Sequence, residues 1–106
     1  MTTFDKREEA FEKQFVHDEE LKFKAEARRN RLLGLWVAEK LGKSGSDADA
    51  YARDVVTAEI DGAGAGVVKK VMADLDAKGV ALSEDEIRAK MTELMVTAIT
   101  QVKAGI

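Results

Sequence analysis

The stretch "LKFKAEARRNRLLGLWVAEKLG", Leu21 to Gly42, decides the fold because its apolar side chains recur at helical spacing over many residues. An apolar residue every three or four positions places one stripe along one side of a helix. The positions in this stripe are Leu21, Ala25, Leu32, Leu35, Trp36 and Leu41. The pattern predicts a long helix that starts after Asp18 and ends at Gly42, because glycine readily adopts the left-handed conformation that closes a helix.

The next two segments show the same period. Ser46 or Asp47 can cap a second helix, whose apolar positions are Ala48, Tyr51, Ala52, Val55, Val56 and Ile60. A strand over "DVVTAEI" is the alternative, but a single strand would leave its backbone groups unpaired. The glycines of "DGAGAG" precede a third helix that closes at Gly79 and carries Val68, Val71, Met72 and Leu75.

A fourth helix follows Ser83, which forms a capping-box pattern with Glu86. Its apolar positions are Ile87, Met91, Leu94, Met95, Ala98 and Val102. The chain contains no proline, so glycines and capping residues alone separate its helices. Short connections favour neighbouring antiparallel helices, and the sequence therefore predicts an all-α fold, a small four-helix bundle over residues 18–106.

Residues 1–17 differ from this bundle because they are dense in charge and carry a thin apolar stripe. Phe4, Phe11 and Phe15 stand seven and four positions apart, which places all three near one side of a helix. Such a stripe buries little surface, and a helix of this length is marginal in water by itself. We expect an amphipathic, partly mobile N-terminal helical segment that becomes ordered on a surface.

Composition narrows the classes of function. The chain has 106 residues, a net charge of −3 and no cysteine, so disulfides and thiolate metal sites are excluded. An acidic balance argues against a nucleic-acid binder, which needs excess Lys and Arg to neutralise phosphates. No apolar run approaches the roughly 20 residues of a membrane-spanning helix, and the charged start is unlike a signal sequence. We expect a cytoplasmic protein.

A concentrated group of cations stands out in this acidic chain. Lys24, Arg28 and Arg31 share one helix face at i, i+4 and i+7, with Lys22 and Arg29 to one side. One interpretation is a solvated face whose charges pair with Glu20 and Glu26. The other is an anion site, because guanidinium groups bind phosphates and carboxylates through paired hydrogen bonds. Trp36 or Tyr51 could offer a ring to a base.

Other candidate chemistry is weak. The glycines at 62, 64 and 66 give G-x-G-x-G, which does not match the G-x-G-x-x-G of a dinucleotide loop, and no Lys-Ser or Lys-Thr pair follows as in a Walker loop. His17 is the single histidine, so a histidine-pair metal site is ruled out. No nucleophile, base and oxyanion site can be assembled. We predict a protein that is not an enzyme, with no metal site and no required cofactor.

The runs "HDEELKFKAEARRN" and "LLGLW" closely resemble the zeta subunit family, small inhibitors of the F-type ATP synthase in alpha-proteobacteria. The resemblance continues through "DADAYARDVV", "VVKKVMADL" and "SEDEIRAKMTEL", and so covers nearly the whole chain. The connection "DGAGAG" departs from the family, whose version is more acidic.

This resemblance implies a four-helix fold and a regulatory task at the synthase, peripheral to the inner membrane. It implies that the N-terminal segment inserts at a catalytic interface between alpha and beta subunits of the catalytic head and blocks ATP hydrolysis. The residues so indicated are Phe4, Asp5, Lys6, Arg7, Glu8, Phe11 and Phe15. It also implies ADP or ATP as a regulatory ligand, which we assign to Lys24, Arg28, Arg29 and Arg31. The alternatives are an adenine-nucleotide-sensing helical module or a general protein-interaction adaptor.

Overall fold

The computed structural model describes residues 19–59 and 64–105, and this part of the chain is helical without strands. The predicted all-α fold is therefore confirmed, and "DVVTAEI" continues a helix as far as Thr57. The N-terminal segment predicted over residues 1–17 lies outside the described residues. The helices are α2 (Glu19–Lys40), α3 (Gly45–Thr57), α4 (Ala65–Lys78) and α5 (Glu84–Ala104).

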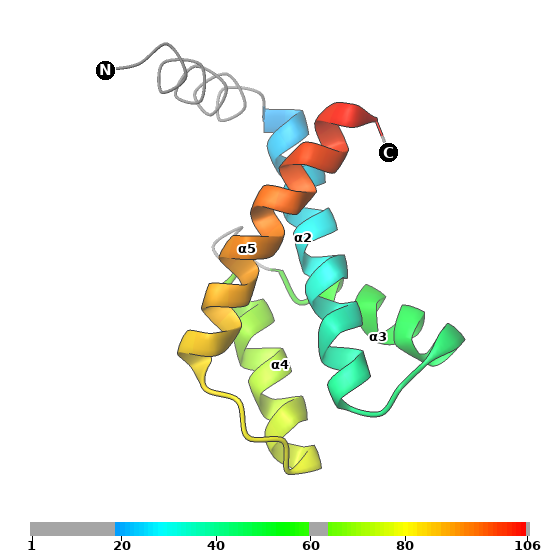
Figure 1. Cartoon of the computed structure of the whole chain (residues 1–106), viewed down its shortest axis with the longest axis vertical. Coiled ribbons are helices and arrows are strands. Elements are labelled where there is room, and N and C mark those ends of the chain that lie inside the picture. The colour runs from blue at the N-terminus through cyan, green and yellow to red at the C-terminus, as the bar shows by residue number, and fades with distance from the viewer. Residues whose placement is uncertain (1–18, 60–63, 106) are drawn as a thin grey trace.

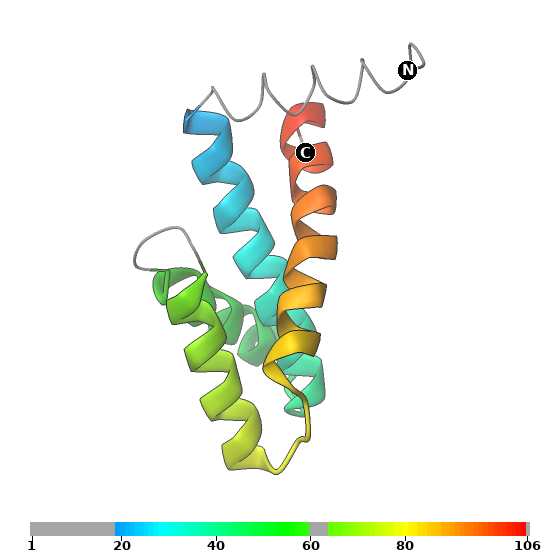
Figure 2. The same ribbon diagram turned by 90° about the vertical axis from the view of Figure 1, so that its left-hand side faces the viewer.

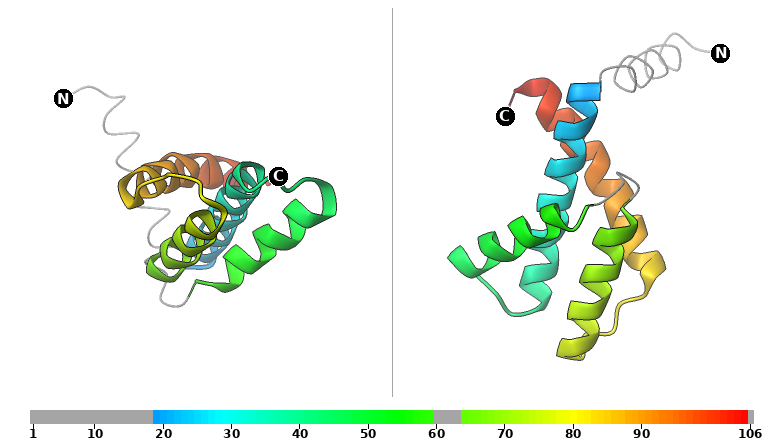
Figure 3. Two further views of the ribbon diagram at one scale, coloured as in Figure 1. Left: turned by 90° about the horizontal axis from the view of Figure 1, so that it is seen from below. Right: turned by 180° about the vertical axis from the view of Figure 1, so that it is seen from behind.

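α2 forms the centre of the bundle, because it contacts each of the other three described helices. α2 and α5 run antiparallel along its length (Figure 1), and α2 packs most extensively on α3 and α5. α3 crosses α2 rather than running along it, as the view from behind shows (Figure 3). α3 and α4 cover one end only, so the first turns of α2 and the last turns of α5 extend beyond them (Figure 2).

The buried side of α2 differs from the predicted stripe. Leu33, Val37 and Ala38 are fully buried, whereas Leu32, Leu35 and Trp36 are only half-buried. Trp36 still packs against the core. The contacts of α2 with α3, α4 and α5 make its buried face wide and shift its centre to Leu33, Val37 and Ala38. The remaining core side chains are Leu41, Tyr51, Val55, Val67, Val68, Val71, Leu75, Ile87 and Met91.

Helix ends follow local capping chemistry. Gly42 and Gly79 adopt positive φ after α2 and α4, as the sequence predicted for both. The Ser83 hydroxyl accepts a hydrogen bond from the Glu86 backbone N–H at 3.1 Å, which confirms the predicted N-cap of α5. The predicted cap at Ser46 or Asp47 was wrong, because α3 begins at Gly45 with Ser44 in the N-cap position.

Gly34 sets how closely α2 and α3 approach. A Cβ atom added at Gly34 would lie 2.6 Å from the Ala52 Cα atom, well inside van der Waals contact. Only glycine fits here without moving the backbone of α3. The glycine in "LLGLW" is therefore a packing residue of the α2–α3 crossing.

Candidate functional site

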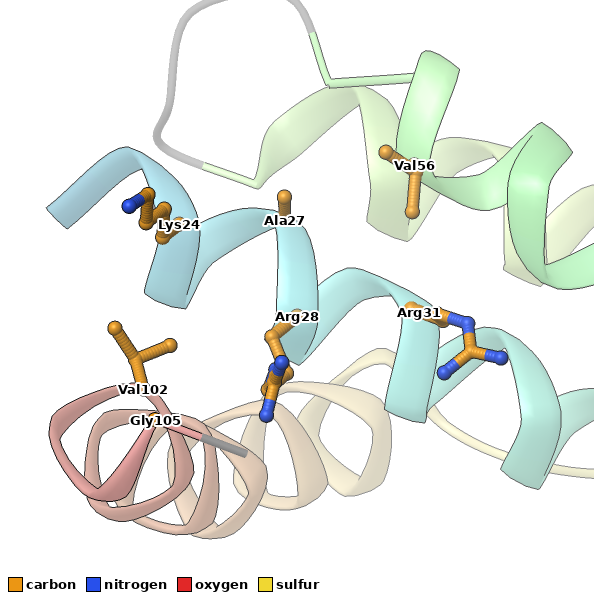
Figure 4. A pocket seen from close by; sticks show the side chains of 7 residues that line it. All are labelled: Lys24, Ala27, Arg28, Arg31, Val56, Val102 and Gly105. Carbon is orange, nitrogen blue, oxygen red and sulfur yellow. The ribbon is translucent and has the colours of Figure 1, made fainter. Parts of the chain in front are cut away.

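Three of the predicted anion-binding side chains line one hollow at the extended end of the bundle. Lys24, Arg28 and Arg31 contribute from α2, and the hollow has a volume of about 560 Å³. Arg28 points toward α5, with the Lys24 amine and the Arg31 guanidinium on either side of it along α2 (Figure 4). The other lining residues are Ala27 from α2, Val56 from α3, Val102 from the last turn of α5 and Gly105, which caps its C-terminal end.

The hollow combines positive charge with apolar walls. Among the described residues that line it, the three charged ones are all cationic. The Arg28 Nη1 atom donates a 3.4 Å hydrogen bond to Gln101 Oε1, which directs the guanidinium toward α5. Lys24 forms a 3.1 Å ion pair with Glu20, but both side chains are exposed, so the pair holds Lys24 weakly. This arrangement suits an anion that also carries an apolar part.

Arg29, the fourth predicted residue, lies elsewhere. It does not line the hollow and is 8% exposed. Its Nη2 atom lies 3.2 Å from Glu59 Oε2, and its Nε atom donates a 3.0 Å hydrogen bond to Asn30 Oδ1. The Arg29 side chain is therefore already engaged inside the protein, while its neighbours Arg28 and Arg31 face the hollow.

Asn30 and Glu59 complete a polar network that the sequence analysis missed. The fully buried Asn30 side chain donates through Nδ2 to Glu59 Oε2. The other oxygen of that carboxylate, Oε1, accepts a 3.0 Å hydrogen bond from the Gly64 backbone N–H. One carboxylate thus joins α2, the end of α3 and the start of α4. Polar residues at positions 26, 29 and 30, on the same buried face as Ala25 and Leu33, were the available signal.

The two candidate rings are not part of the hollow. Trp36 lies between two lysines, with the Nζ atoms of Lys40 and Lys90 at 4.5 Å and 5.4 Å from its ring centroid. The Tyr51 hydroxyl donates a 2.8 Å hydrogen bond to Asp74 Oδ2. Burial raises the pKa of Tyr51, and the hydrogen bond and negative charge of Asp74 raise it further. Trp36 and Tyr51 are both absent from the residues that line the hollow beside Arg28.

Residues 19–59 and 64–105 contain no candidate metal site. No group of three or more His, Cys, Asp or Glu side chains in this part of the chain could hold a metal ion. His17 and the seven residues predicted to contact the ATP synthase lie outside it. None of its helices is both long enough and apolar enough to cross a membrane.

The four described helices, with a basic hollow between α2 and α5, define the chain as a small all-α protein. A family model described as ATPase inhibitor subunit zeta matches residues 1–101, and the chain belongs to this family. A solved structure, titled as a solution NMR structure of a protein, is 49% identical in sequence. It covers 81% of this chain and 99% of its own, with a TM-score of 0.71. No curated protein matches the sequence.

Proposed function

We propose that this chain inhibits ATP hydrolysis by the F-type ATP synthase and that residues 1–17 enter a catalytic interface between its alpha and beta subunits. Membership of an ATPase inhibitor family carries this proposal, because the family match begins at residue 1 and so includes the whole segment. The protein acts on the cytoplasmic side, held at the inner membrane through the synthase.

The sequence of the segment supplies a physical basis for binding. Phe4, Phe11 and Phe15 form an apolar stripe that the cleft between two subunits can bury. The charges of Asp5, Lys6, Arg7 and Glu8 then pair at the rim of the cleft. A helix wedged at an interface that must open and close stops the catalytic cycle mechanically, without any bond made or broken by the inhibitor.

A hydrolysis assay with the isolated catalytic head tests this function. The full chain is compared with a variant that begins at Asp18, at increasing concentrations of each. We expect the full chain to suppress hydrolysis and the shortened variant to leave it unchanged. Unchanged hydrolysis with the full chain would refute the inhibitor function and favour a general adaptor.

We further propose that ADP or ATP binds in the hollow lined by Lys24, Arg28 and Arg31 and modulates inhibition. The support is the group of three cations from one face of α2, since guanidinium groups bind phosphate oxygens in pairs. The nearby apolar side chains Val56 and Val102 can cover the less polar part of a nucleotide. Arg29 is left out of this site because Glu59 and Asn30 already occupy its guanidinium.

Titration of ADP, with GDP as a competitor of equal charge, tests the nucleotide site. Amide chemical shifts of α2 and the last turns of α5 should change saturably with ADP, and Arg28→Gln or Arg31→Gln should weaken binding. Arg53→Gln serves as a matched control, because Arg53 is an exposed arginine on α3 that does not line the hollow. Saturable ADP binding by a chain that fails to inhibit would instead identify a nucleotide-sensing module.

A further inference from the structure

One large aromatic side chain stands in solvent near the start of α2. Phe23 is 66% exposed, and among the described residues Val96 on α5 is the other large exposed hydrophobic, at 65%. Removing the ring of a phenylalanine from water favours association, because apolar surface leaves water. An exposed ring at this place is therefore a strong candidate for contact with a partner.

The position of Phe23 on the helix explains why it is uncovered. Asn30 and Gly34 follow it at i+7 and i+11, so all three share one side of α2. Further toward the C-terminal end of α2, α3 covers this side of the helix. There Glu59 is bonded to Asn30, and Ala52 packs against Gly34. The first turns of α2 extend beyond α3 and α4 (Figure 2), and Phe23, near the start of α2, is exposed.

We propose that Phe23 is a docking anchor for the catalytic head whose ATP hydrolysis this chain inhibits. The inference rests on the proposed function and extends its contact surface from residues 1–17 into the bundle. Phe23 lies four residues after Glu19, or about 6 Å along the helix axis from the start of α2. A partner that holds residues 1–17 therefore lies within reach of this ring.

The side chains around Phe23 indicate what the partner surface offers. Ala27 follows it at i+4 and is also exposed, which extends the apolar spot. Glu19 precedes it at i−4 and adds negative charge at one edge. The matching surface is an apolar depression for the ring with basic side chains on the side of Glu19.

Two variants of matched exposure test the anchor in the hydrolysis assay. Phe23→Ala should raise the concentration needed for half-maximal inhibition about tenfold, as expected for an aromatic residue central to an interface. Val96→Ala should leave it within about twofold, since Val96 is equally exposed but lies on α5. Circular dichroism should give the same melting temperature for both variants as for the unmodified chain, because neither side chain is part of the core.

The possible outcomes distinguish a failure of the Phe23 docking proposal from a failure of the proposed inhibitor function. If the unmodified chain inhibits and Phe23→Ala inhibits equally well, the anchor is refuted while the inhibitor function stands. Stronger inhibition by Phe23→Ala would refute it too, and would mean that the ring holds back residues 1–17 of its own chain. If sedimentation shows a dimer for the unmodified chain but a monomer for Phe23→Ala, and inhibition is unchanged, the ring contacts a second copy of the chain instead of the catalytic head. An unmodified chain without inhibition overturns both proposals.

Discussion

Arg29 Nη2 lies 3.2 Å from Glu59 Oε2, which ties the middle of α2 to the end of α3. The side chain of Arg29 is 10% exposed and that of Glu59 is 16% exposed, so water screens this pair little. Asn30 and the Gly64 backbone N–H bond to the same carboxylate. The pair therefore belongs to a network that fixes the corner between α3 and α4 against α2.

Replacing Glu59 by alanine should destabilise the protein by about 2–3 kcal/mol, because Arg29 and Asn30 would lose a buried acceptor together. Urea unfolding followed by circular dichroism measures the change. Glu93→Ala is the control, since the Glu93 carboxylate in the Glu93–Lys90 ion pair is exposed and should contribute less than about 0.5 kcal/mol. Equal effects of the two substitutions would show that the buried network adds no stability.

Gly34→Ala should destabilise the bundle by about 1–3 kcal/mol through the contact with Ala52. Helix propensity alone predicts the opposite sign, a gain of about 1 kcal/mol for alanine over glycine in a helix. The melting temperature separates the two effects by direction. A higher melting temperature for Gly34→Ala would contradict the close approach of α2 and α3.

Tyr51 should ionise only at a pH well above the ordinary tyrosine pKa of 10.0, because burial and Asp74 favour the neutral hydroxyl. It is the single tyrosine, so phenolate absorbance reports on it alone. The folded-state pKa exceeds the unfolded one, so this contribution to stability is complete below pH 10.0 and is lost as pH rises toward the folded-state pKa. Asp74→Asn should lower the pKa of Tyr51, and an unchanged titration curve would refute the link.

Ser83→Ala should cost about 1 kcal/mol, because the Ser83 hydroxyl accepts the Glu86 backbone N–H at the start of α5. Ser44 offers a matched control, since it occupies the N-cap position of α3 but makes no side-chain capping hydrogen bond. Ser44→Ala should therefore change the free energy of unfolding by only a few tenths of a kcal/mol. Chemical denaturation of both variants checks the difference, and a reversed order would contradict the capping assignment.

Local signals in the sequence predicted the helices well. The cap formed by Ser83 and Glu86 and the helix ends at Gly42 and Gly79 depend only on contacts between residues close in sequence. The local sequence therefore determines these helix ends. The position of α3 between two turns was also predictable, although its first residue was not. The reason is that Ser44, Ser46 and Asp47 are all acceptable caps, and local sequence does not choose among them.

Long-range relationships escaped the sequence patterns. Apolar residues fill "LLGLW" almost continuously, so periodicity could not show that Leu33 rather than Leu32 faces the core. Arg29 belongs to the cationic run Arg28–Arg31, yet its partner Glu59 is 30 positions away and only the packing of α3 brings them together. Gly34 carried a readable signal, because glycine inside a strong helix usually has a packing reason.

A cross-link from the N-terminal segment to the catalytic head tests the central claim most directly. A photoreactive phenylalanine derivative replaces Phe11 in the full chain, and Val96 carries the same group as a control. The account predicts that the group at position 11 links to the alpha or beta subunit during hydrolysis, and the group at position 96 does not. Inhibition by the labelled chain without any link from position 11 to either subunit would contradict the account.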